Sequence, residues 1–345
     1  MNKTFQKIVG IGLAAMSLFS LAACGNDSGS SSGKEYSVGI VQFMDHPSLN
    51  QITENIEAEL AAKETELGVK FNVSFYNGQA DATTLNQIGS ELVQKNVDII
   101  VPIATPAAQV MQSVTEDVDI PIVFSAVSDP VSAGLVDDMS APGGKITGTS
   151  DSLNTDSIMQ LMFALDPDCD YVGLLYSKSE DASKVPIEEA KAFLDEKGVK
   201  YIEKTGSNAD EIVSAADALV AEGVDAVFTP TDNTVQGVEL AIYEKFANAG
   251  IAHYAGADSF ALNGALVGYG VDYTVLGKAT ADMVVDILVN GANPAEMAVQ
   301  TFDNGVATVN TDTADALGYD MDTIKSAFDG LCTEIVETTT SEEFE

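Results

Sequence analysis

Short apolar runs along the chain alternate with longer stretches in which apolar residues recur every three or four positions. Residues 38–43 (VGIVQF) predict a buried strand, because the run is short and rich in β-branched and aromatic residues. Residues 49–67 place Ile52, Ile56 and Leu60 on one face and predict a helix that ends at Gly68. The alternation continues, with strands expected at 70–76, 98–103 and 120–125 and helices at 82–94 and 106–116. Strands that alternate with helices in this way indicate βαβ units and a parallel sheet.

The pattern is repeated in the second half of the chain. Residues 96–108 read NVDIIVPIATPAA, and residues 223–235 read GVDAVFTPTDNTV, 127 positions later. Further strands follow the first-half order at similar offsets, at 172–176, 198–201 and 251–254. We therefore predict an α/β protein with two similar doubly wound parallel-sheet domains. Because open parallel sheets bind ligands at the carboxyl ends of their strands, the repeat predicts that Thr105 and Asp232 lie on opposite sides of one cleft.

Three crossings between the two domains are expected. The first is predicted at the glycine-rich segment 143–148, the second at 268–270 and the third at 301–305. They divide the chain into an N-terminal domain of residues 36–147 and 275–302, and a C-terminal domain of residues 148–274 and 303–345. Such a three-strand hinge predicts that the domains close around a ligand.

The first residues are typical of a processing signal. Two lysines precede an apolar segment at 8–20, and residues 21–24 (LAAC) resemble a bacterial lipobox. We predict a signal peptide at 1–23, acylation of Cys24 and a flexible polar linker at 24–35. The alternatives are a buried helix or a membrane span, but a span needs roughly 20 apolar residues. A lipid on Cys24 would hold the protein outside the cytoplasm on the cell membrane without a spanning segment.

The chain is strongly acidic, with a formal net charge of −37 that becomes −39 once the two lysines of the signal are removed. Such a charge repels phosphates, so we expect no nucleic-acid partner. Every basic residue is a lysine, and the chain contains neither arginine nor tryptophan. The sequence leaves open whether Cys169 and Cys332 pair. Neither has neighbours at zinc-ligand spacing, and we expect no metal.

Several segments resemble a known family. They are QFMDHPSLNQ (42–51), IATPAAQ (103–109), VFSAVSDPVSAGLV (123–136), YSKSEDAS (176–183), PTDNTV (230–235) and GVDYTVLGKAT (270–280). In this order they are similar to the ABC-transporter substrate-binding lipoproteins of the tryptophan/tyrosine type, over residues 37–319. The resemblance implies a type I periplasmic-binding-protein fold, delivery of a ligand to an ABC permease, and an amino-acid-like ligand. The chain has Ser177 and Ala182 where the family pattern has asparagine.

An amino-acid ligand needs partners for its carboxylate and for its ammonium. Without arginine, the carboxylate must use helix N-termini, hydroxyls or lysine. Thr105, followed by a proline, predicts a helix start at the cleft, although Thr105 could serve only as the helix cap. Ser125 and Ser128 follow the next strand and add hydroxyls. For the ammonium we expect Asp232, solvated in the open cleft, with Asp258 as the alternative acid.

The remaining candidates would surround the ligand side chain. Phe43, Tyr176 and Tyr269 stand at predicted strand ends and are either ligand walls or core residues. His46, in the first strand-to-helix loop, is either a donor to the ligand or an ordinary loop residue. Glu180 and Asn233 stand within the segments that carry the resemblance and complete the predicted ligand-binding set.

An enzyme is the competing class. The chain has no P-loop and no H-E-x-x-H motif, and we predict neither catalysis nor a cofactor. A sugar or nucleoside carrier of the same fold is the second alternative. The absence of arginine and tryptophan argues against sugar binding. The expected partners are a small-molecule ligand, an ABC permease and the membrane through its lipid, with the protein itself a monomer.

Overall fold

The computed structural model describes residues 33–302 and 305–343, which belong to one compact unit. The predicted signal peptide, the acylation of Cys24 and most of the predicted linker lie outside the described residues. Within 33–302 and 305–343, no helix is both long and apolar enough to cross a membrane. Cys169 and Cys332 are both free thiols, so they do not form a disulfide.

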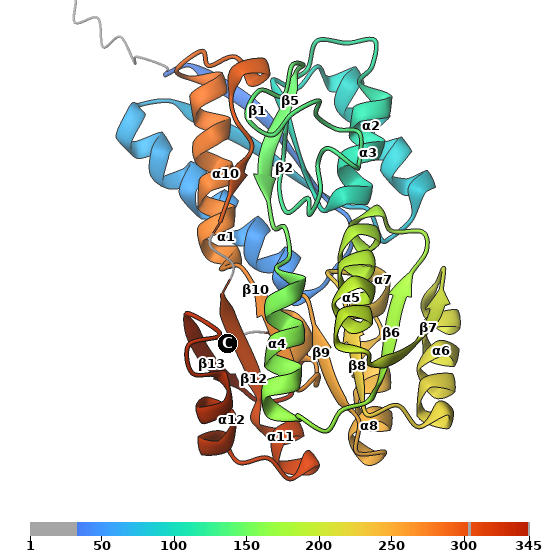
Figure 1. The fold of residues 1–345 in the computed structure, drawn as a ribbon. Coiled ribbons are helices and arrows are strands. Elements are labelled where there is room, and N and C mark those ends of the chain that lie inside the picture. Colours follow the sequence, from blue (N-terminus) through green and yellow to red (C-terminus); the bar gives the residue numbers. More distant parts are fainter. Residues whose placement is uncertain (1–32, 303–304, 344–345) are drawn as a thin grey trace, which may run out of the picture. The chain divides into compact units, whose positions relative to one another are not determined.

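Six strands form the first sheet, of which β1, β2 and β5 are labelled in Figure 1. Their order is β11-β5-β4-β3-β1-β2, and every pair is parallel. Their bounds are β1 Glu35–Gln42, β2 Lys70–Asn77, β3 Ile99–Ile103, β4 Ile122–Phe124, β5 Ile146–Ser150 and β11 Gln300–Thr301. The helices associated with this sheet are α1 Pro47–Leu67, α2 Ala82–Lys95, α3 Thr105–Val114 and α10 Tyr273–Leu288, with the short η2 Pro294–Glu296 before β11.

Seven strands form the second sheet, in the order β13-β12-β10-β9-β8-β6-β7. Their bounds are β6 Tyr171–Ser177, β7 Lys200–Gly206, β8 Ala226–Thr229, β9 Ala252–Ala255, β10 Val267–Gly270, β12 Val306–Asn310 and β13 Glu334–Thr338. Only β12 runs antiparallel to its neighbour β10. The first five strands of each sheet share one spatial order, with the first strand between the second and the third. The predicted duplication and α/β fold class are therefore confirmed.

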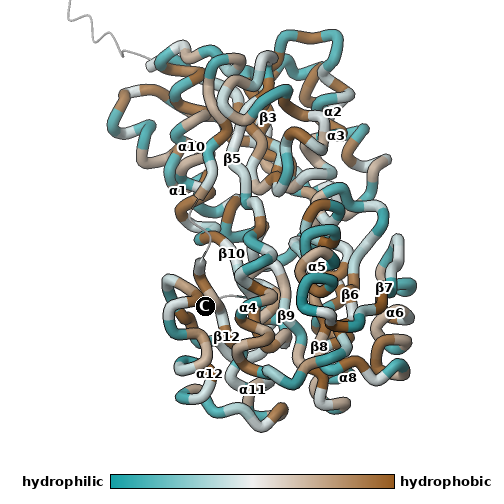
Figure 2. Tube along the Cα trace, in the orientation of Figure 1, coloured by the Kyte–Doolittle hydropathy of each residue, from teal (hydrophilic) through white to brown (hydrophobic). Residues whose placement is uncertain are grey.

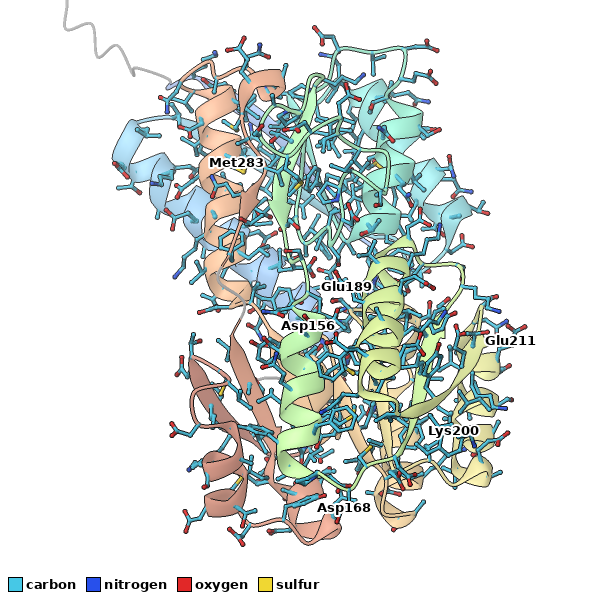
Figure 3. The ribbon with its side chains drawn as sticks, viewed as in Figure 1. Asp156, Asp168, Glu189, Lys200, Glu211 and Met283 are labelled. Carbon is cyan, nitrogen blue, oxygen red and sulfur yellow. The ribbon has the colours of Figure 1, made fainter. Side chains whose placement is uncertain are left out.

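The second sheet is accompanied by a larger set of helices. They are α4 Thr155–Leu165, η1 Asp181–Ser183, α5 Lys184–Lys197, α6 Ala209–Glu222, α7 Asn233–Gln236, α8 Glu239–Asn248, α9 Asp258–Leu262, α11 Thr311–Leu317 and α12 Met321–Phe328. Hydropathy changes repeatedly along the outer helices in Figure 2, as expected for helices with one buried face. Charged side chains such as Glu211 and Lys200 extend outward in Figure 3, whereas Met283 of α10 is buried.

Local chemistry explains where the helices stop. α1 buries Ile52, Ile56 and Leu60 and ends at Gly68, which has φ 66°. The same left-handed conformation recurs at Gly198 after α5, with φ 72°. Glycine adopts this backbone without the steric cost of a Cβ, and it lets the chain turn directly into β2 and β7. The repeated Gly-Val-Lys phrase therefore encodes the same helix-to-strand turn twice.

The first crossing lies later than the sequence predicted. Residues 146–150 form β5 and pair with β4, so the chain leaves the first sheet at 151–154 and not at 143–148. Gly148 serves close packing, because a Cβ there would stand 2.1 Å from the Phe124 carbonyl oxygen. The second crossing directly follows β10, and the third lies between β11 and β12. The predicted boundary between 147 and 148 would cut β5, and the other domain boundaries stay a prediction.

Candidate functional site

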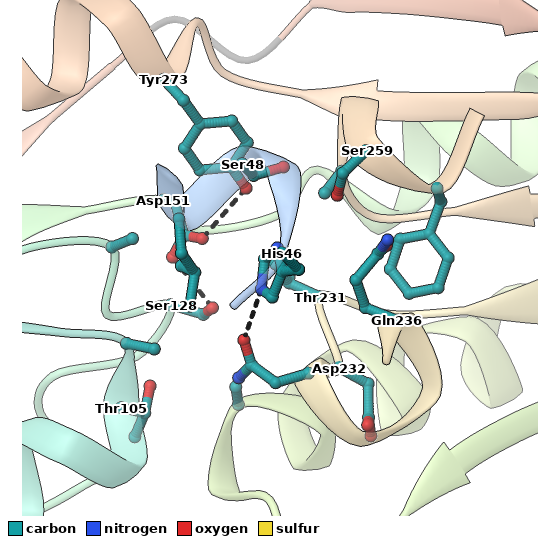
Figure 4. A pocket seen from close by; sticks show the side chains of 17 residues that line it. His46, Ser48, Thr105, Ser128, Asp151, Thr231, Asp232, Gln236, Ser259 and Tyr273 are labelled. Atoms are coloured by element: carbon teal, nitrogen blue, oxygen red, sulfur yellow. Dashed lines mark hydrogen bonds between the residues drawn. The ribbon is translucent and has the colours of Figure 1, made fainter. Parts of the chain in front are cut away.

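Loops at the carboxyl ends of strands from both sheets surround one pocket (Figure 4). The first sheet contributes loops after β1, β3, β4 and β5, and the second sheet contributes loops after β6, β8, β9 and β10. The wall is formed by His46, Ser48, Leu49, Ala104, Thr105, Ala126, Ser128, Asp151, Ala182, Thr231, Asp232, Asn233, Gln236, Ala257, Ser259, Phe260 and Tyr273. Five predicted candidates are among them: His46, Thr105, Ser128, Asp232 and Asn233. Their roles toward a ligand stay predictions.

The helix that begins at Thr105 presents an uncapped N-terminus. Its N-cap is Ala104, whose methyl side chain cannot accept a hydrogen bond from the first backbone N–H groups, so Thr105 is not the cap. Ala104 has φ 77° and ψ 153°, a backbone region that is essentially limited to glycine. Ala126, at the end of β4, also has a positive φ of 52°. Free N–H groups and the helix dipole at such an end attract an anion.

Asp151 is a buried acid on this wall that the sequence analysis missed. Its Oδ1 accepts a hydrogen bond from Ser128 Oγ at 3.0 Å, and its Oδ2 accepts one from Tyr273 O–H at 3.3 Å. Burial raises the pKa of Asp151, and these two hydroxyl bonds oppose the rise. Both partners are neutral, so the carboxylate is matched to a cation such as an ammonium group.

Asp232 lies in the same wall, but both of its carboxylate oxygens accept hydrogen bonds from the protein itself. Oδ1 accepts from the backbone N–H of Val235 at 3.0 Å and thereby caps α7. Oδ2 accepts from Ser177 N–H and from Ser183 Oγ, each at 2.6 Å. Burial raises the pKa of Asp232, and the side chain is 1% exposed. The expectation of a solvated Asp232 is therefore wrong for this structure.

Glu180 holds the first turn of α7. It accepts from the backbone N–H and the side-chain amide of Asn233, at 3.1 and 2.8 Å, and from the backbone N–H and hydroxyl of Thr234, at 2.7 and 2.8 Å. Burial, followed by the charge of Asp232, raises the pKa of Glu180 to about 8. Glu180 does not line the pocket and acts on its wall through Asn233.

His46 connects the two sides of the pocket. Its Nε2 lies 3.1 Å from Asn233 Oδ1. Because the Asn233 amide nitrogen donates to Glu180, Asn233 Oδ1 must be the acceptor and His46 the donor through Nε2–H. Burial lowers the pKa of His46 to about 4, so the ring is neutral. Its Nδ1 is then an acceptor, and it has no partner among the described residues.

The other candidates lie elsewhere. Ser125 is buried behind the wall, 2.9 Å from Thr280 Oγ1. Asp258 accepts from Ser48 Oγ at 2.7 Å, and burial raises its pKa to about 6. Phe43 lines a neighbouring cavity between the β1 loop and α7.

The two tyrosine candidates are also outside the pocket wall. Tyr176 points to Glu203, with its hydroxyl 2.6 Å from Oε2, and burial raises its pKa to about 12. Tyr269 is a core residue of the second sheet, 1% exposed.

Sequence reasoning missed Ser48, Asp151, Gln236, Ser259 and Tyr273. Asp151 directly follows β5 and would have been found had residues 146–150 been predicted as a strand. Tyr273 comes three residues after β10, at the start of α10. Gln236 lies three residues after Asn233 and reaches the pocket because α7 makes a single turn.

Comparison with known proteins identifies the family. A model of the family described as ABC transporter substrate binding protein matches residues 37–326. The chain belongs to this family and is the substrate-binding protein of an ABC transporter, with the type I periplasmic-binding-protein fold.

The chain is also similar to proteins whose ligand or state is known. A tyrosine-binding protein of Clostridioides difficile (strain R20291) is 31% identical over 280 residues, which are 78% of this chain and 79% of that protein. A Streptococcus pneumoniae ABC domain in complex with L-Trp superimposes with a TM-score of 0.79 at 32% identity, over 87% of this chain and 100% of that one. The ligand-free, open structure of a substrate-binding protein with adhesive properties from Clostridium difficile superimposes with a TM-score of 0.66 at 31% identity. The match covers 89% of this chain and 100% of that one.

Proposed function

We propose that this chain binds a free aromatic amino acid outside the cytoplasm, where a lipid on Cys24 anchors it to the membrane, and delivers the ligand to an ABC permease. The observation that carries the proposal is a pair of complementary features in one pocket. A buried carboxylate with neutral partners, Asp151, lies in the same wall as the uncapped N-terminus of α3. An amino acid carries an ammonium and a carboxylate on one carbon, and these two features match its two charges.

In the proposed complex, Asp151 accepts hydrogen bonds from the ligand ammonium. The ligand carboxylate accepts from the first N–H groups of α3 and from the hydroxyl of Thr105, which takes the place of an arginine fork. Leu49, Ala126 and Phe260 line the pocket and give the side chain apolar contact. Two relatives, a tyrosine-binding protein and a protein in complex with L-Trp, support an aromatic side chain.

The pocket in this structure is too small for such a ligand. Its cavity volume is about 20 Å³, which holds about one water molecule. His46 contacts Asn233 across it, and Gln109 of α3 donates to Asp181 of η1 at 2.7 Å. The chain superimposes better on the L-Trp complex than on the ligand-free open structure, at nearly equal identity. These observations support a closed form that must open to admit its ligand.

We infer that the protein acts by binding alone, without catalysis, and as a monomer. Its family supports binding and delivery to a transporter as the whole role.

A thermal-shift screen of the purified mature protein with free amino acids, sugars and nucleosides tests the proposal. A ligand at 100 times its Kd should stabilise the fold by roughly 2.7 kcal/mol. We expect tyrosine or tryptophan to do so. Stabilisation by a sugar or nucleoside, with no response to any amino acid, would contradict the amino-acid assignment.

A further inference from the structure

The second-sheet side of the pocket contains polar atoms that the protein leaves unpaired. Gln236 Oε1 and Ser259 Oγ have no hydrogen-bond partner within 33–302 and 305–343, and the two residues are 4% and 0% exposed. In Figure 4 they lie on the opposite side of His46 from Asp151 and Ser128. A buried polar atom without a partner carries a desolvation cost, which a ligand group of matching polarity would recover.

The hydrogen-bond network fixes which end of the Gln236 amide faces the pocket. The backbone carbonyl of Ser341 can only accept, so the Asn263 amide nitrogen, at 2.7 Å, must donate to it. Asn263 Oδ1 is thereby the acceptor for Gln236 Nε2, at 2.6 Å. Turning either amide around would bring two like atoms together. Gln236, which lines the pocket, therefore keeps its oxygen, an obligate acceptor, unpaired.

The same reasoning makes His46 Nδ1 an acceptor, as its other nitrogen donates to Asn233. Ser259 Oγ can donate or accept. His46 Nδ1 and Gln236 Oε1 are thus two unpaired acceptors on residues that line the pocket, and each would pair with a hydrogen-bond donor on the ligand. Among aromatic amino acids, the side chains of tyrosine and tryptophan carry one O–H or N–H donor, and the side chain of phenylalanine carries none.

Gln236 is also well positioned for such a role. It ends α7, and its backbone N–H donates to the Asp232 carbonyl at 2.9 Å. Asp232 caps the same turn, so the start of α7 and the amide of Gln236 are both held by the protein. A side chain fixed in this way loses little freedom when a ligand binds.

We propose that Gln236 Oε1 is a specificity-determining acceptor that receives a hydrogen bond from the O–H or N–H of the ligand's aromatic side chain, so that the site discriminates against phenylalanine. This inference rests on the proposed function, because it requires an aromatic amino acid in the pocket with its ammonium at Asp151.

Calorimetric titration of the mature protein with tyrosine, tryptophan, phenylalanine and 4-fluorophenylalanine tests it. The fluorinated ligand is close to tyrosine in size but has no side-chain donor. We expect tyrosine or tryptophan to bind at least about tenfold more tightly than both donor-free ligands. Equal affinity for all four would overturn the role of Gln236 and leave the proposed function standing. Absence of binding by every amino acid would instead refute the proposed function.

A variant separates recognition from packing. Gln236→Met keeps the length of the side chain and removes the acceptor. We expect it to reduce the preference for tyrosine or tryptophan over phenylalanine to within about threefold, with phenylalanine affinity unchanged or improved. Merely structural damage would weaken all ligands equally, and that outcome would count against the inference. If the variant does not fold, the comparison of ligands on the wild-type protein still decides.

Discussion

The loops after β3 and β8 occupy equivalent places in the two sheets and carry the repeated phrase, yet they meet the pocket differently. After β3, the N-cap of α3 is Ala104, which provides no side-chain cap. After β8, the N-cap of α7 is Asp232, whose side chain caps the helix, and Glu180 adds a second carboxylate over the same turn. One helix end is left free for an anion, and the other is already occupied by the protein's own acids. Equivalent topology thus supplies two helix starts, and side-chain chemistry decides which one can receive a ligand carboxylate.

The largest effect is expected from Asp151→Asn. The variant removes the charge that would face the ligand ammonium, and loss of one partner in such a buried pair costs about 2–5 kcal/mol. Affinity for the amino acid should therefore fall about 30-fold or more. Isothermal titration calorimetry measures the change. Asp258→Asn is the matched control, since Asp258 is a half-buried acid outside the pocket wall whose pKa is also raised by burial. Loss of binding in Asp258→Asn alone would mean that the ligand ammonium binds Asp258 and not Asp151.

Asp232→Ala should act mainly on stability. It removes the cap of α7 and leaves the Ser177 N–H and the Ser183 hydroxyl without their acceptor. We expect the free energy of unfolding to fall by about 2–4 kcal/mol, as measured by urea denaturation. Asp81→Ala, at the exposed cap of α2, should cost less. Unchanged stability combined with lost binding would restore Asp232 as a direct ligand group.

The acids over α7 predict a pH dependence of stability. Because the pKa of Glu180 is raised to about 8 in the folded protein, the folded state binds more protons than the unfolded chain between pH 4.5 and 8. Its contribution to stability is thus fully present below pH 4.5 and is lost as pH rises toward 8. We expect the free energy of unfolding to be lower at pH 8 than at pH 5, by a few kcal/mol or less. Denaturation at several pH values measures this slope, which Glu180→Gln should flatten. An identical slope in the variant would exclude Glu180 as its source.

The smallest effect concerns the free helix end itself. Ala104 has a backbone conformation that suits glycine, so Ala104→Gly should relieve strain and stabilise the fold by about 1 kcal/mol, after the entropic cost of glycine. Ala107→Gly, within the same helix, should destabilise by about 1 kcal/mol. Thermal denaturation of both variants measures whether each is more or less stable than the wild-type protein. A loss of stability in both would mean that the backbone at Ala104 is unstrained.

Much of the fold could be predicted from local patterns. Residues 49–67 have helical periodicity and end at a glycine, and the structure has α1 there with Gly68 in the left-handed conformation. The repeated phrases predicted two similar domains, because similar strand and turn chemistry in the same order folds in the same way, and the first five strands of both sheets share one spatial order. The placement of Thr105 and Asp232 at one pocket follows from the same repeat. The first crossing was misplaced because glycines at 143–148 predict a turn equally well whether it leads out of a sheet or into β5.

The sequence by itself determined the two α/β halves, the order of their strands and helices along the chain, the strand ends that meet at the pocket and the family. Only the tertiary structure decided which acid is available to a ligand. Asp232 is engaged because Ser177 and Ser183, 55 and 49 residues away in the chain, donate to it. The amide of Gln236 is oriented by Asn263, which is itself oriented by the backbone carbonyl of Ser341 in the last described segment of the chain. Periodicity reports which face of an element is buried, but the polarity of a pocket depends on hydrogen-bond partners that folding brings from distant segments.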